Sequence, residues 1–320
     1  MIIYQNNFKY IAYQWLSSVR IKNKIPTYIK YEHIIINHLI PAFGNYEMIQ
    51  IDTLKINDFI MEKSQNGRIN LLGGLSPKSV KDILCVLKQI IKYAKSLDIE
   101  INSNLSITEP RVLKKDVSIL SKENQKILEL YLYNNINLLN LGILLVLYTG
   151  LRLGEICALT KKDIDLTNNI IKISKTMQRI KNPNKQAESK TIILIDTPKS
   201  ISSIRSIPIP AFLVPTMQEL LSGLSPDSYI LTGFENKFIE PRNYENIFKR
   251  ILKECQLENI HFHALRHTFA TRAVEANFDI KTLSELLGHS NVSITLNKYV
   301  HSSMELKKKN MDKLNPLCMR

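Results

Sequence analysis

The chain has 320 residues and a mass of 36.9 kDa, more than one hydrophobic core usually serves, so we expect two domains. Lys and Arg number 43 against 29 Asp and Glu, a formal charge of +14, which indicates a polyanionic partner such as nucleic acid, or otherwise only a charge that keeps the protein soluble. A hydrophobic content of 44% excludes a disordered chain, and four cysteines without a C-x-x-C pair exclude a zinc knuckle or a disulfide framework. The most apolar stretch is too short to span a bilayer, so we expect a soluble cytoplasmic protein without membrane association.

The first third of the sequence predicts helices, because apolar residues recur there at spacings of three and four. The clearest predicted helix runs from Pro77 to Ala94 and carries one apolar stripe with lysines largely off it. These lysines either face DNA or form a solvated surface, and the pattern does not decide between the two. They are Lys78, Lys81, Lys88 and Lys92, and the other predicted helices span Phe8 to Arg20, Pro26 to Leu39, and Lys55 to Gln65.

The periodicity fades between Asn102 and Val117, where a polar, charged segment is typical of a linker. We therefore expect a helical domain over residues 1–105, a linker over 106–117 and a second domain over 118–303. Ser121 is expected to cap the first helix of the second domain.

The second domain is predicted to begin with helices through Leu147 and to turn at Thr149-Gly150. Three Ile-rich runs then predict one small antiparallel sheet, with a long basic insert at residues 177–190 between the first two strands. The fold class expected is therefore α+β, mainly α with a small antiparallel β-sheet. The strands are predicted at Ile170–Ser174, Thr191–Ile195 and Ser203–Ile209, and later helices at Phe212–Leu221, Tyr244–Cys255, Ala264–Asn277, Lys281–Leu287 and 304–320.

Four segments of the second domain carry side chains suited to a phosphodiester. Guanidinium groups can hold nonbridging phosphate oxygens through charge-assisted hydrogen bonds. A tyrosine hydroxyl has a reference pKa of about 10, so it acts as a nucleophile only with help from a base or a nearby positive charge. The segments are Thr149-Gly-Leu-Arg-Leu-Gly-Glu155, Thr197-Pro-Lys-Ser200, His263-Ala-Leu-Arg266, and Leu287-Gly-His289 with Asn297-Lys-Tyr299.

The order and spacing of these segments resemble the active-site signature of the tyrosine recombinases, also called the phage integrase family. That family has an arginine in G-L-R-x-G-E, a lysine in a β-hairpin, an H-x-x-R pair, a histidine in L-G-H and a tyrosine shortly after it, in this order. The resemblance covers about Leu120 to His301, and Gly74 to Tyr93 is similar to the family's core-binding domain. It implies a helical core-binding domain and a catalytic domain that form a C-shaped clamp around double-stranded DNA.

The resemblance also implies a role for each matching side chain. Tyr299 would be the nucleophile, Arg152 and Arg266 the phosphate clamp, His263 a base or phosphate partner, Lys199 the general acid, and His289 a hydrogen-bond donor to a phosphate oxygen. Glu155 is expected to orient Arg152 or a neighbouring group, and His267 to be a structural hydrogen bonder. Lys175, Lys185 and Lys190 lie near Lys199 in the sequence and are alternatives to it.

Plainer interpretations exist for several of these residues. Arg152 could be a helix-start arginine paired with Glu155, and His289 a residue that merely follows a glycine helix cap. The cluster His261, His263 and His267 could suggest a metal site, but no carboxylate or thiol completes a convincing ligand set. The family chemistry implies neither a metal nor a cofactor.

The implied reaction leaves a 3′-phosphotyrosyl link and a free 5′-hydroxyl, which attacks the matching link on a partner duplex within a homotetramer. We expect integration and excision of a mobile element, because the lysine context and the basic insert resemble the conjugative-element branch. A tail helix over 304–320 is expected to dock on a neighbouring subunit, and an accessory DNA-bending or directionality protein is a further expected partner. Xer-type dimer resolution, type IB topoisomerase-like relaxation and a non-catalytic DNA-binding regulator are the alternatives, the first because the core-binding pattern already starts near Phe8.

Overall fold

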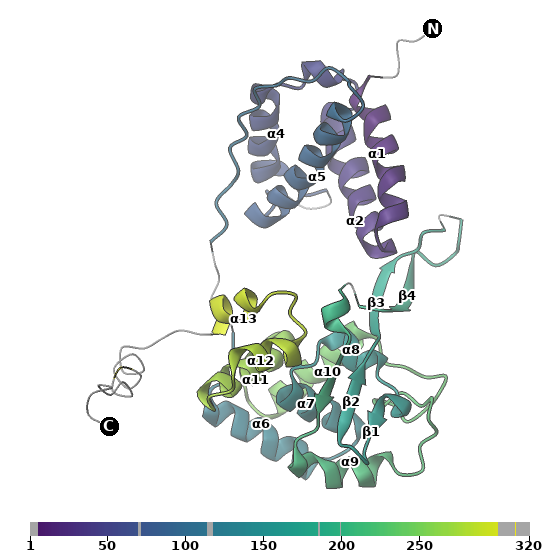
Figure 1. The fold of residues 1–320 in the computed structure, drawn as a ribbon, viewed down its shortest axis with the longest axis vertical. Coiled ribbons are helices and arrows are strands. Elements are labelled where there is room, and N and C mark those ends of the chain that lie inside the picture. Colours follow the sequence, from purple (N-terminus) through teal and green to yellow (C-terminus); the bar gives the residue numbers. More distant parts are fainter. Residues whose placement is uncertain are drawn as a thin grey trace, which may run out of the picture. The chain divides into compact units, whose positions relative to one another are not determined.

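A computed structural model describes residues 6–69, 72–113, 118–184, 186–198, 200–299 and 311, with the side chains of residues 201 and 297–299 outside this description. The chain forms two compact units, drawn in Figure 1. Unit 1 comprises Met1–Lys115 and Ile180–Glu188, and unit 2 comprises Asp116–Arg179 and Ser189–Arg320. Apart from residue 311, the helix expected over 304–320 lies outside the described residues.

Unit 1 is built from helices packed around their apolar faces. All four predicted helices are present, and the second is divided because Pro41 has no backbone N–H with which to continue an α-helical ladder. It ends in a π-helical turn, Ile35–Leu39, before a further short helix. The helices are α1 (Phe8–Lys22), α2 (Ile25–Ile34), α3 (Ile40–Phe43), α4 (Thr53–Asn66) and α5 (Pro77–Lys95).

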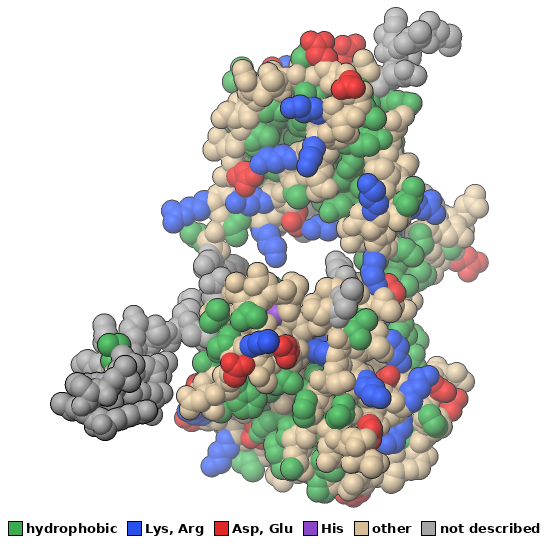
Figure 2. Space-filling view, viewed as in Figure 1, with side chains coloured by type: hydrophobic (Ala, Val, Ile, Leu, Met, Phe, Trp, Pro, Cys, Tyr) green, Lys and Arg blue, Asp and Glu red, His purple; other side chains and the backbone are tan. Residues whose placement is uncertain are grey.

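The amphipathic pattern of α5 is confirmed. Ser76 caps the helix by accepting a hydrogen bond from the Ser79 backbone N–H, and its apolar stripe is buried from Val80 to Ile90. Burial of each such Val, Leu or Ile side chain contributes about 1.5–3 kcal/mol. In the view of Figure 2 the Lys and Arg side chains of unit 1 stand apart from one another on the surface instead of forming one continuous patch.

The segment that follows α5 packs against unit 1 over part of its length. The Thr53 hydroxyl donates to Asn104 O at 3.3 Å and accepts from Ser106 N at 3.0 Å. Glu109 pairs with Lys88 at 2.5 Å and with Lys81 at 3.2 Å, both on α5. The beginning of the sequence predicted as a linker therefore has fixed contacts with α4 and α5.

Unit 2 is mainly helical as well. Ser121 caps its first helix as predicted, because its hydroxyl accepts from Asn124 N at 3.1 Å. The sequence did not predict the short helices α8 and α13, whose lengths of six and eight residues leave little room for a periodic pattern. The helices are α6 (Lys122–Asn134), α7 (Leu138–Thr149), α8 (Leu153–Ala158), α9 (Val214–Leu221), α10 (Pro241–Glu254), α11 (His263–Glu275), α12 (Ile280–Leu287) and α13 (Val292–Tyr299).

The strands form two small sheets. The expected antiparallel sheet is confirmed for the first and third predicted strands, but the run predicted at Thr191–Ile195 pairs with a further strand in the second sheet. One sheet has the order β1-β2-β5 and runs antiparallel, and the other pairs β3 with β4. Strand β3 overlaps the segment expected to be a basic insert, and within this strand only Met177 and Ile180 are buried. Two apolar positions among polar neighbours gave too weak an alternation to predict a strand. The strands are β1 (Ile164–Asp165), β2 (Ile170–Ile173), β3 (Thr176–Lys181), β4 (Thr191–Asp196) and β5 (Arg205–Pro208).

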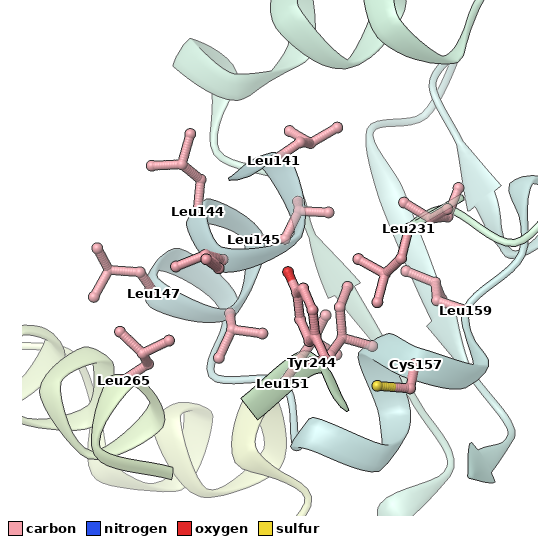
Figure 3. Close-up of a cluster of buried hydrophobic side chains, with 14 of the residues drawn as sticks. Leu141, Leu144, Leu145, Leu147, Leu151, Cys157, Leu159, Leu231, Tyr244 and Leu265 are labelled. Carbon is pink, nitrogen blue, oxygen red and sulfur yellow. The ribbon is translucent and has the colours of Figure 1, made fainter. Parts of the chain in front are cut away.

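The core of unit 2 surrounds α7, which is buried on almost every side. Tyr244 of α10 lies among the leucines of this core, and its hydroxyl donates to Leu139 O at 2.7 Å (Figure 3). A Cβ atom at Gly142 would lie 2.3 Å from that hydroxyl, so the glycine makes room for the tyrosine. Within the part of the chain that the structure describes, no helix has the length and apolar character needed to cross a membrane.

Candidate active site

The turn between α7 and α8 positions Arg152. Gly150 ends α7 with a left-handed φ of 66°, and a Cβ atom there would lie 2.6 Å from the Phe269 ring, so only glycine suits the position. Arg152 then caps α8. Its backbone N–H donates to Glu155 Oε2 at 2.9 Å, and its Nη1 donates to Glu155 Oε1 at 2.7 Å. The helix-start pair with Glu155 is therefore formed, yet Arg152 keeps a third of its side chain exposed at 33%.

Arg266 extends from α11 into the interior and is only 2% exposed. Its Nη1 donates to Gly150 O at 2.7 Å, and its Nη2 donates to Leu287 O at 2.7 Å. The same Nη2 lies 3.0 Å from His289 Nε2. Arg266 thus joins the ends of α7 and α12, two segments that the sequence predicted would share one site.

A third arginine, Arg205 at the start of β5, belongs to the same cluster but was predicted only as a strand residue. It is 6% exposed, and its Nη1 and Nη2 donate to the two oxygens of Glu155 at 3.0 and 2.9 Å. Its Nε donates to Leu286 O at 2.6 Å. The available sequence signal was a basic residue within a short strand that ends in Pro208, directly after the expected lysine segment.

We call these three residues, Arg152, Arg205 and Arg266, the arginine cluster. They donate to three successive carbonyl oxygens at the end of α12: Arg205 to Leu286, Arg266 to Leu287, and Arg152 to Gly288 at 3.0 Å. The last carbonyls of a helix have no partner within the helix and carry partial negative charge, so cations are stabilised there. The end of α12 is therefore a common anchor for three guanidinium groups from three different elements.

His289 follows this anchor. Gly288 has a left-handed φ of 61° and caps α12, as the plain interpretation of the motif expects. The ring of His289 is also held on both sides, by Arg266 at Nε2 and by the Thr295 hydroxyl at Nδ1, 2.8 Å away. Since a guanidinium can only donate, Nε2 accepts, which places the proton on Nδ1 and makes the buried Thr295 its acceptor.

Glu155 supplies the negative charge in the arginine cluster and is 2% exposed. Burial works to raise the pKa of its carboxyl group, but the hydrogen bonds and charge of Arg205, followed by the charge of Arg152, outweigh burial and hold the pKa below its ordinary value. Glu155 is thus held in its ionised form between two arginines.

His263 and His267 lie on one face of α11, as expected for residues four apart. Their ring centroids are 4.5 Å apart, edge to face. His261 is exposed instead, with its Nδ1 3.6 Å from Glu245. Among the described residues, no three His, Cys, Asp or Glu side chains are arranged to hold a metal ion.

Lys199 lies outside the described residues. The strands before and after it, β4 and β5, belong to different sheets, so these two strands do not form the hairpin expected around Lys199. Of the alternative lysines, Lys175 is engaged with Asp163 at 3.1 Å and with the Thr160 hydroxyl at 3.3 Å. Tyr299 is the last residue of α13, and the description does not include its side chain.

Comparisons with known proteins match both parts of the chain. The phage integrase family profile matches residues 118–305, and the profile of the phage integrase N-terminal SAM-like domain matches residues 7–64. A tyrosine recombinase XerC-like protein of Caldanaerobacter subterraneus is 27% identical over 96% of this chain and 82% of its own length. The transposase from transposon Tn916 of Enterococcus faecalis is 29% identical over 54% of this chain and 44% of its own length.

Among solved structures, the Tn1549 transposon integrase in complex with a circular intermediate DNA has the same fold, with a TM-score of 0.72, 23% identity, and coverage of 95% of this chain and 99% of that one. A lambda integrase dimer bound to a core site is similar with a TM-score of 0.60, 17% identity, and coverage of 95% and 79%. The matching profile spans more than half of the chain. The chain therefore belongs to the phage integrase family and is a tyrosine recombinase, an enzyme that breaks and rejoins DNA.

Proposed function

We propose that this recombinase integrates and excises a mobile element, and that its reaction proceeds through a 3′-phosphotyrosyl link to Tyr299. The observation that carries the proposal is the pair Arg152 and Arg266, anchored on the successive carbonyls of Gly288 and Leu287. Two guanidinium groups held on neighbouring acceptors form a doubly cationic site for one phosphodiester.

In the proposed mechanism, Arg152 and Arg266 bind the nonbridging oxygens and stabilise the charge that develops on them as Tyr299 attacks phosphorus. His263 takes the tyrosine proton or holds the phosphate, and Lys199 protonates the 5′-oxygen as the P–O bond breaks. The 5′-hydroxyl of a partner strand then attacks the phosphotyrosyl bond, releases Tyr299 and completes the exchange. The bond energy is retained in the phosphotyrosine, so the chain needs no cofactor.

The role proposed for His289 requires a change in its hydrogen bonding. In the free protein its Nε2 accepts from Arg266, so it has no proton to give at that atom. When the phosphate takes over the Arg266 donors, Nε2 is released and can carry a proton to a phosphate oxygen. Thr295 then accepts from Nδ1–H of the charged ring.

The proposed partners follow from this reaction. Double-stranded DNA binds both a core-binding domain, residues 1–105, and a catalytic domain, residues 118–303, joined through 106–117. Four protomers supply the four strand ends that two rounds of exchange require, with residues 304–320 docked on a neighbouring protomer and an accessory bending or directionality protein as a further partner. The proposed place of action is the cytoplasm.

The mobile-element assignment is supported by the likeness to the Tn916 transposase in sequence and to the Tn1549 integrase in fold. Xer-type dimer resolution is a second candidate, because the XerC-like relative aligns over 96% of this chain and 82% of its own length. Deleting the gene separates the two. Loss of a circular element junction supports integration and excision, whereas filamentous cells with unresolved chromosome dimers support dimer resolution.

The test of the chemistry is the trapping of a protein–DNA adduct that resists SDS, on DNA flanking the gene and in the presence of EDTA. Wild type is compared with Tyr299→Phe and with the matched control Tyr133→Phe, whose ring is exposed on α6. We expect an adduct from wild type and Tyr133→Phe and none from Tyr299→Phe. An adduct that persists in Tyr299→Phe contradicts the assignment of the nucleophile.

A further inference from the structure

Arg205 occupies a position in the arginine cluster that the proposed mechanism leaves unexplained. It is nearly as buried as Arg266, and it donates hydrogen bonds to both oxygens of Glu155, to Leu286 O, and to Ser203 O at 3.1 Å. Arg205 is paired with a buried carboxylate through two hydrogen bonds, whereas the acceptors described above for Arg266 are neutral, so the charge of Arg205 is compensated and it is poorly placed to hold a phosphate. Its contribution must come through the residues that it touches.

The charges of the cluster show what that contribution is. Glu155 is one buried carboxylate that contacts two arginines, Arg205 with two hydrogen bonds and Arg152 with one side-chain hydrogen bond. The bidentate pair with Arg205 balances the charge of Glu155 and occupies both of its oxygens. One carboxylate faces two guanidinium groups, so one net positive charge remains, and the partly exposed Arg152 presents it to a phosphate.

The same side chain fixes the anchor at the end of α12. The Nε donor of Arg205 holds Leu286 O, and a Cβ atom at Gly288 would lie 3.1 Å from Arg205 Cδ, so the aliphatic part of the side chain lies against the cap of this helix. Arg152 donates to the carbonyl of that same Gly288. Arg205 thus contacts both residues that orient Arg152, the carboxylate on one side and the turn on the other.

We propose that Arg205 is a positioning residue that neutralises Glu155 and holds the Leu286–His289 turn, so that Arg152 stays directed toward the scissile phosphate instead of closing on Glu155. The proposal rests on Arg152 acting as the phosphate ligand described above. Without Arg205, Glu155 would be a buried carboxylate with Arg152 as its remaining cation, and the Coulomb attraction would draw Arg152 onto it.

The kinetic test compares Arg205→Met with the double variant Arg205→Met/Glu155→Gln. The readouts are the single-turnover rate of adduct formation at saturating protein and, separately, the Kd for the same flanking DNA. We expect the rate of Arg205→Met to fall by about 10- to 100-fold, as for loss of charge stabilisation in the transition state, while Kd changes little. Neutralising Glu155 in the double variant releases Arg152, so the double variant should form the adduct several-fold faster than Arg205→Met.

Arg272→Met is the matched control. Arg272 also binds a carboxylate, Glu275, through Nη1 at 2.9 and 3.1 Å and a backbone carbonyl, Leu120 O, at 2.8 Å. Within the described part of the chain it forms no hydrogen bond or ion pair with Glu155 or with the end of α12. Its loss should leave the cleavage rate near that of wild type. If Arg205→Met unfolds, Arg205→Lys serves instead, because an ammonium keeps the positive charge but cannot form the bidentate hydrogen bonds of a guanidinium. The cleavage rate of Arg205→Lys should lie between those of wild type and the Met variant.

A crystal structure of DNA-free Arg205→Met tests the proposal without any cleavable DNA, so its outcome is separate from that of the Tyr299 experiment. We expect the Arg152 guanidinium to lie on both oxygens of Glu155 and its contact with Gly288 O to be lost. An Arg152 and a Leu286–His289 turn that keep their wild-type positions would overturn the proposal. So would a double variant no faster than Arg205→Met.

Discussion

The two units hold positive charge in opposite ways. In unit 1, Lys81 and Lys88 of α5 are 41% and 46% exposed and share one exposed carboxylate, Glu109. In unit 2, Arg205 and Arg266 are almost fully buried and bind fixed acceptors. The lysines are compact charges on flexible stems, whereas the guanidinium groups are rigid forks that bind several acceptors at once.

This difference indicates which charged side chains are suited to binding DNA and which are suited to catalysis. An exposed ion pair is weak and screened by salt, so the α5 lysines can exchange Glu109 for another anion at little cost. A buried donor cannot be removed without leaving its acceptors unsatisfied. The arginine cluster should therefore be sensitive to each substitution, and the lysines should tolerate theirs.

The largest effect is expected from Arg266→Met. Two buried carbonyl oxygens, of Gly150 and Leu287, lose their donor, which should lower the free energy of unfolding by about 3 kcal/mol. Adduct formation should fall by about 100-fold or more. Urea unfolding and single-turnover cleavage measure the two effects.

Arg152→Met tests whether cleavage and stability can be separated within the same cluster. Arg152 is partly exposed, and Arg205 still neutralises Glu155 when it is lost, so cleavage should fall as steeply while stability falls much less. Equal losses of stability in Arg152→Met and Arg266→Met would show that burial does not separate their roles.

A smaller effect is expected from Gly288→Ala, because an L-residue in the left-handed region costs about 1–2 kcal/mol. The added Cβ would also lie 3.1 Å from Arg205 Cδ and from Ser202 O, so the anchor must shift and cleavage should slow. Gly223→Ala is the control, since its φ of 75° is also left-handed but no atom lies within 4 Å of the added Cβ. A cleavage rate that falls equally in both variants would contradict the prediction.

A pH effect is expected in unit 1, at the buried His38. Burial, followed by the charges of Lys63 and His33, lowers the pKa of His38 below its ordinary value of 6.5. The unfolded chain therefore takes up a proton near pH 6.5 that the folded chain does not, and stability falls as the pH drops from 6.5 toward the lowered pKa.

Thermal unfolding measures this effect: the Tm of the unfolding transition of unit 1 at pH 7.5 is compared with its Tm at pH 5.5. The difference should shrink most in His38→Gln and less in His33→Gln, which removes only one of the charges that lower the pKa of His38 and leaves its burial in place. An unchanged difference in His38→Gln would assign the acid sensitivity to other groups.

The smallest effect on stability is expected from the double variant Lys81→Gln/Lys88→Gln, whose Tm should match wild type. If each lysine contacts one phosphate, a plot of the logarithm of the DNA association constant against the logarithm of the salt concentration should become less steep, by about 0.9 per lysine removed. Glu109→Gln removes the competing carboxylate and should tighten DNA binding at low salt. A slope that stays unchanged would mean that these lysines form only a solvated surface.

Local patterns predicted the fold well where the causes are local. The stripe of α5 and the cap at Ser121 depend on residues three or four apart, which the sequence places side by side. The second sheet was missed because β3 buries only Met177 and Ile180, and its pairing with β4 has no local signature. Tertiary pairing decided these strands.

The site was predicted through its motifs but not through its contacts. The motifs indicated that Arg152, Arg266 and His289 belong to one site, and the structure brings these three together. The role of Arg205 in the site was not predicted, because its partner Glu155 lies 50 residues away and no sequence motif connects the two residues. Contacts over 116 residues, from Arg266 to Gly150, and over 136 residues, from Arg152 to Gly288, are likewise products of the folded chain.

The anchor at the end of α12 has a consequence for how such sites evolve. Its three acceptors are main-chain carbonyls, which every amino acid supplies, so neither Leu286 nor Leu287 needs its own side chain to bind an arginine. The donors can be lost by one substitution, but the acceptors cannot. In a set of related sequences the arginines should stay fixed, whereas Leu286 and Leu287 can be replaced by other residues that fit the same space, so correlated substitutions would not reveal these contacts even though they hold the site together.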